Sequence, residues 1–103
     1  MRQINAIIVD DETIATEVLR ELIAVLATDV TVVGTAKDGI EAIEKISTLR
    51  PNLVFMDLEM PLLDGYEVIQ RLAYRSFYLV FTSGSVTPAL KPKPLRLLGV
   101  KLK

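Results

Sequence analysis

Short apolar runs and segments of helical periodicity alternate along this 103-residue chain, and the alternation limits the folds open to it. These runs predict strands over residues 4–9, 30–36, 53–56 and 77–81. The first and third have the length and composition of strands buried in a parallel sheet, and residues 30–36 alternate loosely and are rich in β-branched residues. Apolar residues three and four positions apart predict amphipathic helices over 14–26 and 40–49, and Asp64-Gly65 begins a third. Strands that alternate with helices predict an α/β fold, in which right-handed crossovers build a parallel sheet with helices on both faces.

The composition excludes several classes of function. Half of the residues are hydrophobic and 24% are charged, which predicts one folded domain. The chain has no cysteine and no histidine, so disulfide scaffolds, the usual zinc sites and Ser-His-Asp triads are absent. Any chemistry must therefore use carboxylates, hydroxyls, lysines and the backbone. The longest apolar run near the start is too short for a signal peptide or a membrane span, and we expect a soluble cytoplasmic protein with no membrane partner.

The charges divide the chain into two parts. All 13 acidic residues lie at or before Glu67, with five basic residues among them, and seven basic residues follow without an acid. The sequence therefore predicts a core over residues 1–85 and an atypical basic tail over 86–103 with a short fifth strand at 95–100. Three prolines leave no room there for a crossover helix. The tail has no aromatic residues among its lysines, so we expect it to lean on the acidic core and not to bind nucleic acid.

Polar residues follow three of the predicted strands at the point where each ends. Asp10 and Asp11 follow the first strand, Asp57 the third, and Thr82 and Ser83 the fourth. Ligands collect at the carboxyl ends of parallel strands. If the first and third strands are neighbours, three carboxylates meet in one crevice, where they repel one another unless a cation neutralises them. Oxygen ligands without histidine or cysteine favour Mg²⁺ or Mn²⁺.

A carboxylate, a divalent cation and hydroxyl donors are together the parts needed to receive a phosphoryl group. Taken singly, each part has a simpler explanation. Residues 10–12 can cap a helix, Asp57 can be a turn residue, and residues 82–84 can form a turn. Their joint placement at strand ends favours a functional site.

These motifs resemble the receiver domain of two-component response regulators. The matching segments are IIVDDE at 7–12, FMDLEMP at 55–61 and Asp64-Gly65, and the resemblance extends from the start to about Ser83. It implies a flavodoxin-like, doubly wound parallel sheet of strand order 2-1-3-4. It also implies a cytoplasmic phosphoprotein of a two-component phosphorelay, which accepts a phosphoryl group and is not a turnover enzyme.

By the same resemblance, Asp57 is the phosphoacceptor, and the donor is the phosphohistidine of a sensor histidine kinase. The lack of histidine in this chain agrees, because the donor must then come from a partner. The resemblance implies that Asp11 and Asp57 bind Mg²⁺ directly, that Asp10 holds it through water, and that the backbone carbonyl of Glu59 completes the protein ligands. Thr82 corresponds to the hydroxyl residue that bonds a phosphate oxygen.

The resemblance leaves two positions open. Spacing does not decide between Thr82 and Ser83 for the hydroxyl residue. The family also has a lysine, followed by proline, at the end of a fifth strand. Lys91-Pro92 has this dipeptide, but only eight residues separate it from Thr82, fewer than a parallel crossover needs. Lys101 follows the predicted fifth strand without a proline. Each lysine can equally be a solvated tail residue.

The family's last helix has no counterpart in the tail. Its absence predicts a partly bare sheet face, an exposed edge at residues 77–81, and self-association through this incomplete C-terminal side.

Two other functions stay open. One is a degenerate receiver that only binds a partner protein. The other is a small aspartyl phosphatase, which usually needs an aspartate where Glu59 stands.

Overall fold

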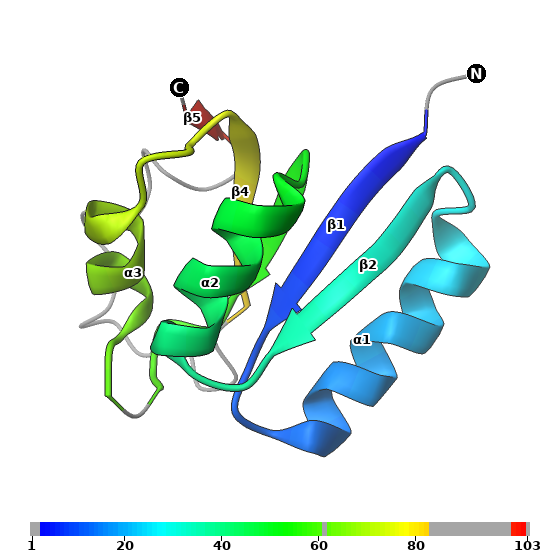
Figure 1. Cartoon of the computed structure of the whole chain (residues 1–103). Helices are drawn as coiled ribbons and strands as arrows, with labels where there is room; N and C mark the ends of the chain where they lie inside the picture. The colour runs from blue at the N-terminus through cyan, green and yellow to red at the C-terminus, as the bar shows by residue number, and fades with distance from the viewer. Residues whose placement is uncertain (1–2, 61, 83–99, 103) are drawn as a thin grey trace.

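The computed structural model describes residues 3–60, 62–82 and 100–102, and for the last of these ranges the backbone only. Eight helices and strands lie in these ranges (Figure 1). In chain order they are β1 (Ile4–Val9), α1 (Thr13–Leu26), β2 (Val30–Ala36), α2 (Gly39–Leu49), β3 (Leu53–Met56), α3 (Gly65–Arg71), β4 (Phe77–Phe81) and β5 (Val100–Leu102). Within the described ranges, no helix has the length and apolar character needed to cross a membrane.

One sheet of order β2-β1-β3-β4-β5 organises the molecule. The first four strands are parallel, which confirms the predicted flavodoxin-like order 2-1-3-4. The chain moves outward from β1 to β2 and then returns past β1 to β3. Right-handed crossovers therefore place α1 on one face of the sheet and α2 and α3 on the other. Figure 1 shows α2 beside α3, with α1 apart from them next to β2.

Only Val100 of the predicted fifth strand, residues 95–100, lies among the described residues, where it begins β5. The strand that the structure contains, β5, runs antiparallel to β4 opposite Phe77–Leu79. An antiparallel neighbour needs no crossover helix, so the prolines of the tail do not prevent it. The predicted exposed edge is therefore paired with β5 over residues 77–79 within the described part of the chain. Self-association through the C-terminal side stays a prediction.

The main core lies between the sheet and the pair α2 and α3. Alternate residues of the central strands point into it, because successive side chains of a strand face opposite sides. Among them are Ile7 and Val9 of β1 and Val54 and Met56 of β3, all fully buried. This core holds β1 and β3 in register up to their carboxyl ends, where the acidic residues follow.

Helix α1 is less buried than its periodicity suggests. Only Thr16 and Ile23 are buried among its 14 residues. The apolar residues Ile14, Val18 and Leu22, which the pattern placed on the inward face, are 79%, 53% and 49% exposed. The helix exists as predicted, but a helical pattern cannot say how many neighbours cover its apolar face.

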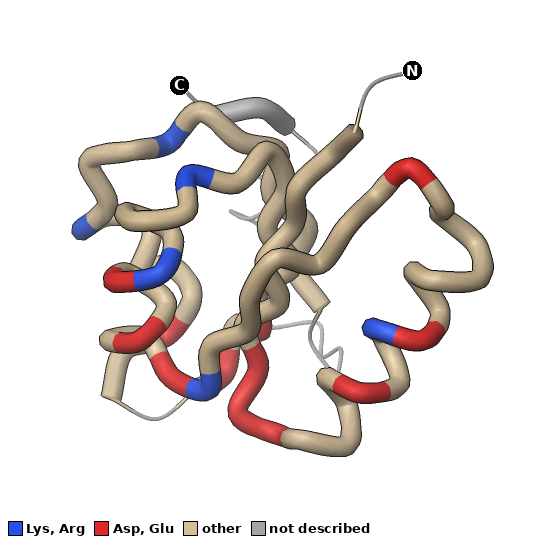
Figure 2. Tube along the Cα trace, turned by 45° about the vertical axis from the view of Figure 1, so that its right-hand side comes forward, with Lys and Arg blue, Asp and Glu red and all other residues tan. Residues whose placement is uncertain are grey.

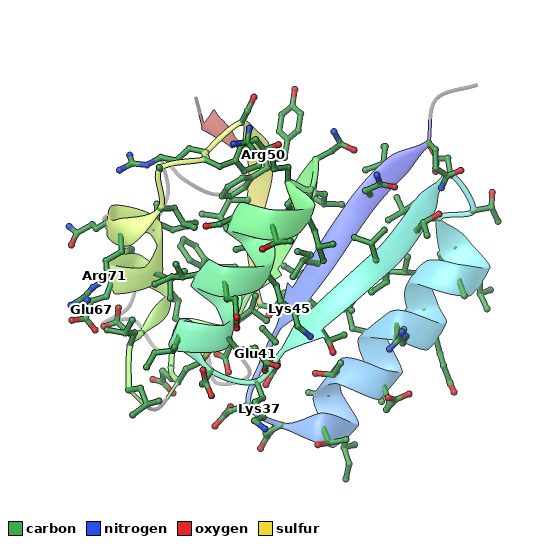
Figure 3. The ribbon with its side chains drawn as sticks, viewed as in Figure 1. Lys37, Glu41, Lys45, Arg50, Glu67 and Arg71 are labelled. Carbon is green, nitrogen blue, oxygen red and sulfur yellow. The ribbon has the colours of Figure 1, made fainter. Side chains whose placement is uncertain are left out.

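A cap at the start of α2 and a lysine in its interior hold the helix in place. The Asp38 carboxylate accepts a hydrogen bond from the backbone N–H of Glu41 at 2.8 Å and so caps the first turn. Further along, Lys45 donates to the backbone carbonyl of Thr35 in β2 at 2.7 Å and pairs with Glu41 at 3.6 Å. Figure 3 shows Lys45 and Glu41 reaching toward β2 from one side of the helix.

Helix α3 begins with a reciprocal capping box. Asp64 accepts from the backbone N–H of Glu67 at 2.9 Å, and the Glu67 carboxylate accepts from the backbone N–H of Asp64 at 3.1 Å. These two bonds satisfy amides that the helix itself cannot pair. A helix of seven residues has few bonds of its own, so its position depends on this cap and on packing.

Replacing Asp64 with alanine is expected to lower the free energy of unfolding by about 1 kcal/mol, because the carboxylate that accepts from the backbone N–H of Glu67 is lost, while the backbone N–H of residue 64 can still donate to Glu67. Urea unfolding followed by circular dichroism measures the change. Glu44→Ala, at an exposed position inside α2, is the control and should stay within about 0.5 kcal/mol of the wild type. Equal stability of the two variants would contradict the capping role.

Candidate functional site

The candidate site lies where β1 and β3 end side by side. These strands are parallel neighbours, and Val9 pairs with Met56 at their carboxyl ends. The backbone N–H of Asp57 donates to the carbonyl of Val9 at 2.9 Å, and that of Asp10 donates to the carbonyl of Ala36 at 3.0 Å. The sheet therefore delivers both aspartates to the same edge. Figure 2 shows several acidic residues gathered at this end of the molecule.

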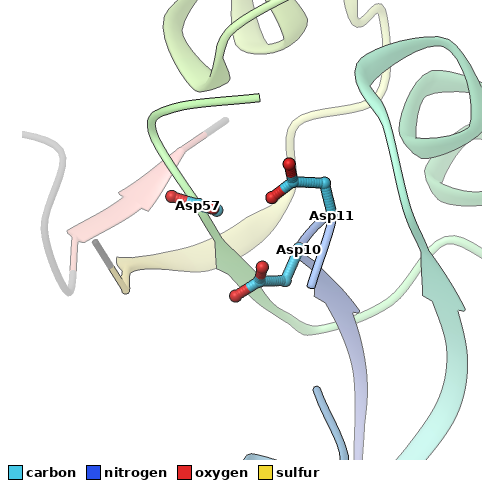
Figure 4. A group of neighbouring side chains, drawn as sticks. All are labelled: Asp10, Asp11 and Asp57. Carbon is cyan, nitrogen blue, oxygen red and sulfur yellow. The ribbon is translucent and has the colours of Figure 1, made fainter. Parts of the chain in front are cut away.

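The structure brings together the three aspartates that the sequence singled out. Asp10, Asp11 and Asp57 each offer a carboxylate oxygen, and these oxygens lie within 4.8 Å of one another (Figure 4). Asp57 is only 8% exposed, Asp10 is half-buried and Asp11 is exposed. One side of the cluster is thus inside the protein and the other faces solvent, from which an ion or a phosphoryl donor can approach.

Two backbone amides orient the inner carboxylates. The Oδ1 atom of Asp57 accepts a hydrogen bond from the N–H of Glu59 at 3.1 Å. The Oδ1 atom of Asp10 accepts from the N–H of Glu12 at 2.9 Å. Each bond runs to the residue two positions on, which is the local turn that aspartate favours. Each carboxylate keeps a second oxygen for another ligand.

Burial raises the pKa of Asp57 from its ordinary value of 3.8 to about 6. The negative charges of Asp10, Asp11 and Glu59 raise this pKa further, and the hydrogen bond from the Glu59 amide opposes them. The ionised carboxylate of Asp57 is therefore held at a free-energy cost. A cation placed between the carboxylates would remove most of that cost.

The donor set suits a hard divalent cation. All three groups are carboxylates, which Mg²⁺ prefers over nitrogen or sulfur ligands. Two ligand atoms on one Mg²⁺, with bonds of about 2.1 Å, lie at most about 4.2 Å apart. The ligand atoms of the three aspartates, which all lie within 4.8 Å of one another, are close to this range. The peptide of Glu59 lies beside Asp57 through its hydrogen bond, and its carbonyl as a ligand stays a prediction.

Thr82 lies at the same edge, directly after β4. Its side chain is half-buried, and its backbone N–H donates to the carbonyl of Met56 at 2.9 Å, one residue before Asp57. The predicted hydroxyl residue is therefore tied to the strand that carries Asp57. The alternative, Ser83, lies outside the described residues, so the choice between the two stays open.

The two candidate lysines are placed differently. Lys91 lies outside the described residues. The backbone of Lys101 lies in β5 opposite Tyr78, the second residue of β4. This register puts the Lys101 backbone near the amino end of β4, whereas Asp57 and Thr82 lie at the carboxyl end of the sheet. The register therefore does not support Lys101 as the lysine of this site.

Gly65 contributes to the site through a contact that its place at a helix start and in the family motif did not predict. Its N–H donates to the carbonyl of Leu58 at 3.2 Å. A Cβ atom at this position would lie 3.0 Å from the carbonyl oxygen of Asp57 and 3.0 Å from Cγ of Met56. Glycine thus lets α3 pack directly against the backbone of Asp57. The Asp-Gly pair was visible in the sequence, but the contact was not.

Two cavities show why size does not identify the site. A cavity of about 260 Å³ borders Asp10 and is lined by Thr13, Thr16 and Lys37 among others. A larger cavity of about 520 Å³ lies at the opposite edge of the sheet, where Gln3 and the described residues around it include no acid or base. The chemistry of the three carboxylates, and not the volume of a pocket, marks the functional edge.

Comparison with known proteins agrees with this geometry. The family model of the response regulator receiver domain matches residues 6–93. The chain is 43% identical over 76 residues to a protein-glutamate methylesterase/protein-glutamine glutaminase of Symbiobacterium thermophilum, and 38% identical over 86 residues to one of Thermotoga maritima. These matches cover 72% and 84% of this chain but 20% and 25% of the relatives. The chain thus spans a fifth to a quarter of their length.

Solved structures show the same likeness. The response regulator domain of Thermotoga maritima CheB superposes with a TM-score of 0.72 at 37% identity, over 84% of this chain and 65% of that one. The REC domain of AraT from Geobacillus stearothermophilus gives a TM-score of 0.79 at 30% identity, over 91% and 74%.

Proposed function

Because this chain belongs to the response regulator receiver domain family, we propose that it accepts a phosphoryl group on Asp57 from a sensor histidine kinase. One observation carries the proposal. Three carboxylates from two adjacent strand ends lie within 4.8 Å of one another, and the innermost is buried with a raised pKa. An isolated turn aspartate would have neither the neighbours nor the burial.

Asp11 and Asp57 would hold Mg²⁺ directly, with Asp10 acting through water and the backbone carbonyl of Glu59 as a further ligand. When bound, Mg²⁺ neutralises negative charge on the carboxylates and on the incoming phosphoryl oxygens. The Glu59 N–H holds one oxygen of Asp57, which leaves the other to attack phosphorus. The new O–P bond forms as the P–N bond of the donor phosphohistidine breaks, and the electron pair stays on the imidazole nitrogen.

The product is a phosphoaspartate whose oxygens can accept new hydrogen bonds. Thr82 lies at the same edge directly after β4, and its hydroxyl donates to a phosphate oxygen in this proposal. That bond draws the end of β4 toward Asp57 and converts a local charge into a change of surface. The domain acts as an acceptor and not as a turnover enzyme. The esterase activity named for its longer relatives is not assigned to this chain.

Incubation with acetyl phosphate and Mg²⁺, followed by intact-mass spectrometry, is expected to add one phosphoryl group to the wild-type chain and none to Asp57→Asn. Removal of Mg²⁺ with a chelator should abolish the adduct. Asp29→Asn, in the turn before β2 and away from the site, is the matched control and should still be labelled. An adduct on Asp57→Asn, or none on the wild type, would overturn the proposal. If Mg²⁺ then also leaves the melting temperature unchanged, the result would favour the alternative function, a degenerate receiver that only binds a partner protein.

A further inference from the structure

Tyr66 connects the two ends of the proposed phosphorylation site. It is the second residue of α3, and its ring lies against that of Phe81, with centroids 5.4 Å apart and planes inclined by 51°. Phe81 is the last residue of β4 and directly precedes Thr82. On its other side, Tyr66 follows Gly65, which packs against the backbone carbonyl of Asp57. Movement at either strand end therefore reaches Tyr66 through a direct contact.

The hydroxyl group of Tyr66 is buried and has no hydrogen-bond partner among the described residues. Burying an unpaired hydroxyl is costly, and such groups in folded proteins usually have a partner in some state of the protein. The burial of the phenol also raises its pKa, with a smaller contribution from the charge of Asp64. Tyr74 shows the ordinary arrangement, since its hydroxyl oxygen lies 2.8 Å from the carbonyl oxygen of Pro51 and 3.0 Å from that of Ser76, and its one proton has an acceptor in either direction.

We propose that Tyr66 is a positioning residue that stabilises the phosphorylated state, because its hydroxyl gains an acceptor at the end of β4 only when Asp57 carries a phosphoryl group. The inference rests on the proposed function. When Thr82 moves to bond the phosphate, the adjoining Phe81 shifts against the Tyr66 ring. The backbone carbonyls at that end of β4 then come within reach of the unpaired hydroxyl.

The test titrates beryllofluoride, an analogue of the phosphoryl group, into the full chain with saturating Mg²⁺. Tyr66→Phe keeps the ring and removes only the hydroxyl. It is expected to weaken beryllofluoride binding about three- to tenfold, the value of one net hydrogen bond. The affinity for Mg²⁺ and the resting melting temperature should not fall. In wild-type protein labelled with ¹³C at tyrosine Cζ, the Tyr66 resonance should shift when beryllofluoride is added.

Tyr74→Phe is the matched control. It is expected to lower the resting melting temperature, because the carbonyls of Pro51 and Ser76 lose the one hydroxyl proton that they share, and to leave beryllofluoride affinity unchanged. Equal beryllofluoride affinity for wild type and Tyr66→Phe would overturn the inference. So would a drop in the resting melting temperature of Tyr66→Phe as large as that of Tyr74→Phe, because the hydroxyl would then have a resting partner. If the wild type itself does not bind beryllofluoride, the proposed function fails, and the inference falls with it.

Discussion

Replacing Asp57 with asparagine is expected to raise the free energy of unfolding of the metal-free protein at pH 7 by about 1–3 kcal/mol. Asparagine has nearly the same shape, and its side-chain oxygen can still accept the hydrogen bond from the Glu59 amide. It carries no charge, so the cost of burying an anion beside Asp10 and Asp11 disappears. The proposed phosphoacceptor thus weakens the fold that presents it.

The increase in the free energy of unfolding caused by Asp57→Asn should become larger as the pH rises. The pKa of Asp57 is about 6 in the folded protein and 3.8 as its ordinary value. Below 3.8 the side chain is protonated in both states and the variant gains little. Between 3.8 and about 6 the folded state holds a proton that the unfolded state loses, so wild-type stability falls as pH rises. Above about 6 the full penalty is present.

Urea unfolding at pH 3.5 and pH 7.5 measures this difference, with Asp29→Asn as the control that should follow the wild type at both pH values. Saturating Mg²⁺ should reduce the difference in stability between Asp57→Asn and the wild type at pH 7.5. A bound cation neutralises the three carboxylates of the wild type, and it stabilises the variant, which has one carboxylate fewer, to a smaller degree. If Asp57→Asn is less stable than the wild type, or is stabilised equally at both pH values, the result would contradict the claim that the buried charge of Asp57 destabilises the fold.

Gly39→Ala is expected to lower the free energy of unfolding by about 2–3 kcal/mol, although alanine normally favours a helix. A Cβ atom on Gly39 would lie 2.5 Å from Cβ of Leu63 and 2.8 Å from its backbone oxygen. These atoms belong to the segment between Asp57 and α3 and cannot rotate away. The start of α2 must therefore separate from that segment, and the core around Val68 loosens.

Gly34→Ala provides the comparison. Its Cβ would approach Cδ1 of Leu49 at 3.0 Å, which is the end of a flexible side chain that can change rotamer. We expect a loss of less than about 1 kcal/mol for this variant. Urea unfolding of both variants measures the difference. Equal losses for Gly39→Ala and Gly34→Ala would show that the close approach of α2 to Leu63 is not a constraint.

Local patterns of apolar residues were enough to predict where the strands and helices lie along the chain. The predicted strands coincide with β1 to β4, because short runs rich in apolar, β-branched and aromatic residues are typical of strands. The first two helices begin at Thr13 and Gly39, one residue before the predicted starts at 14 and 40. The apolar periodicity marks only residues that face the core, and the first residue of a helix need not be one of them.

The sequence predicted which residues belong to the candidate site, but it did not predict the contacts between them. The aspartates after the first and third strands were visible as strand-ending residues. The aspartates meet only if those two strands are neighbours in the sheet. The residues alone do not establish that the strands are neighbours, and the family resemblance only implies it. Burial of Asp57, which raises its pKa, likewise depends on β4 and α3 closing around it.

The amino-acid order alone determined which segments become strands and helices and which acids follow them, since these depend on neighbours a few positions apart. Folding in three dimensions decided the rest: the antiparallel direction of β5, the exposed face of α1, and the unpaired hydroxyl of Tyr66 against Phe81. Each of these depends on contacts between residues distant along the chain. Such contacts leave no periodic trace in the sequence of either partner.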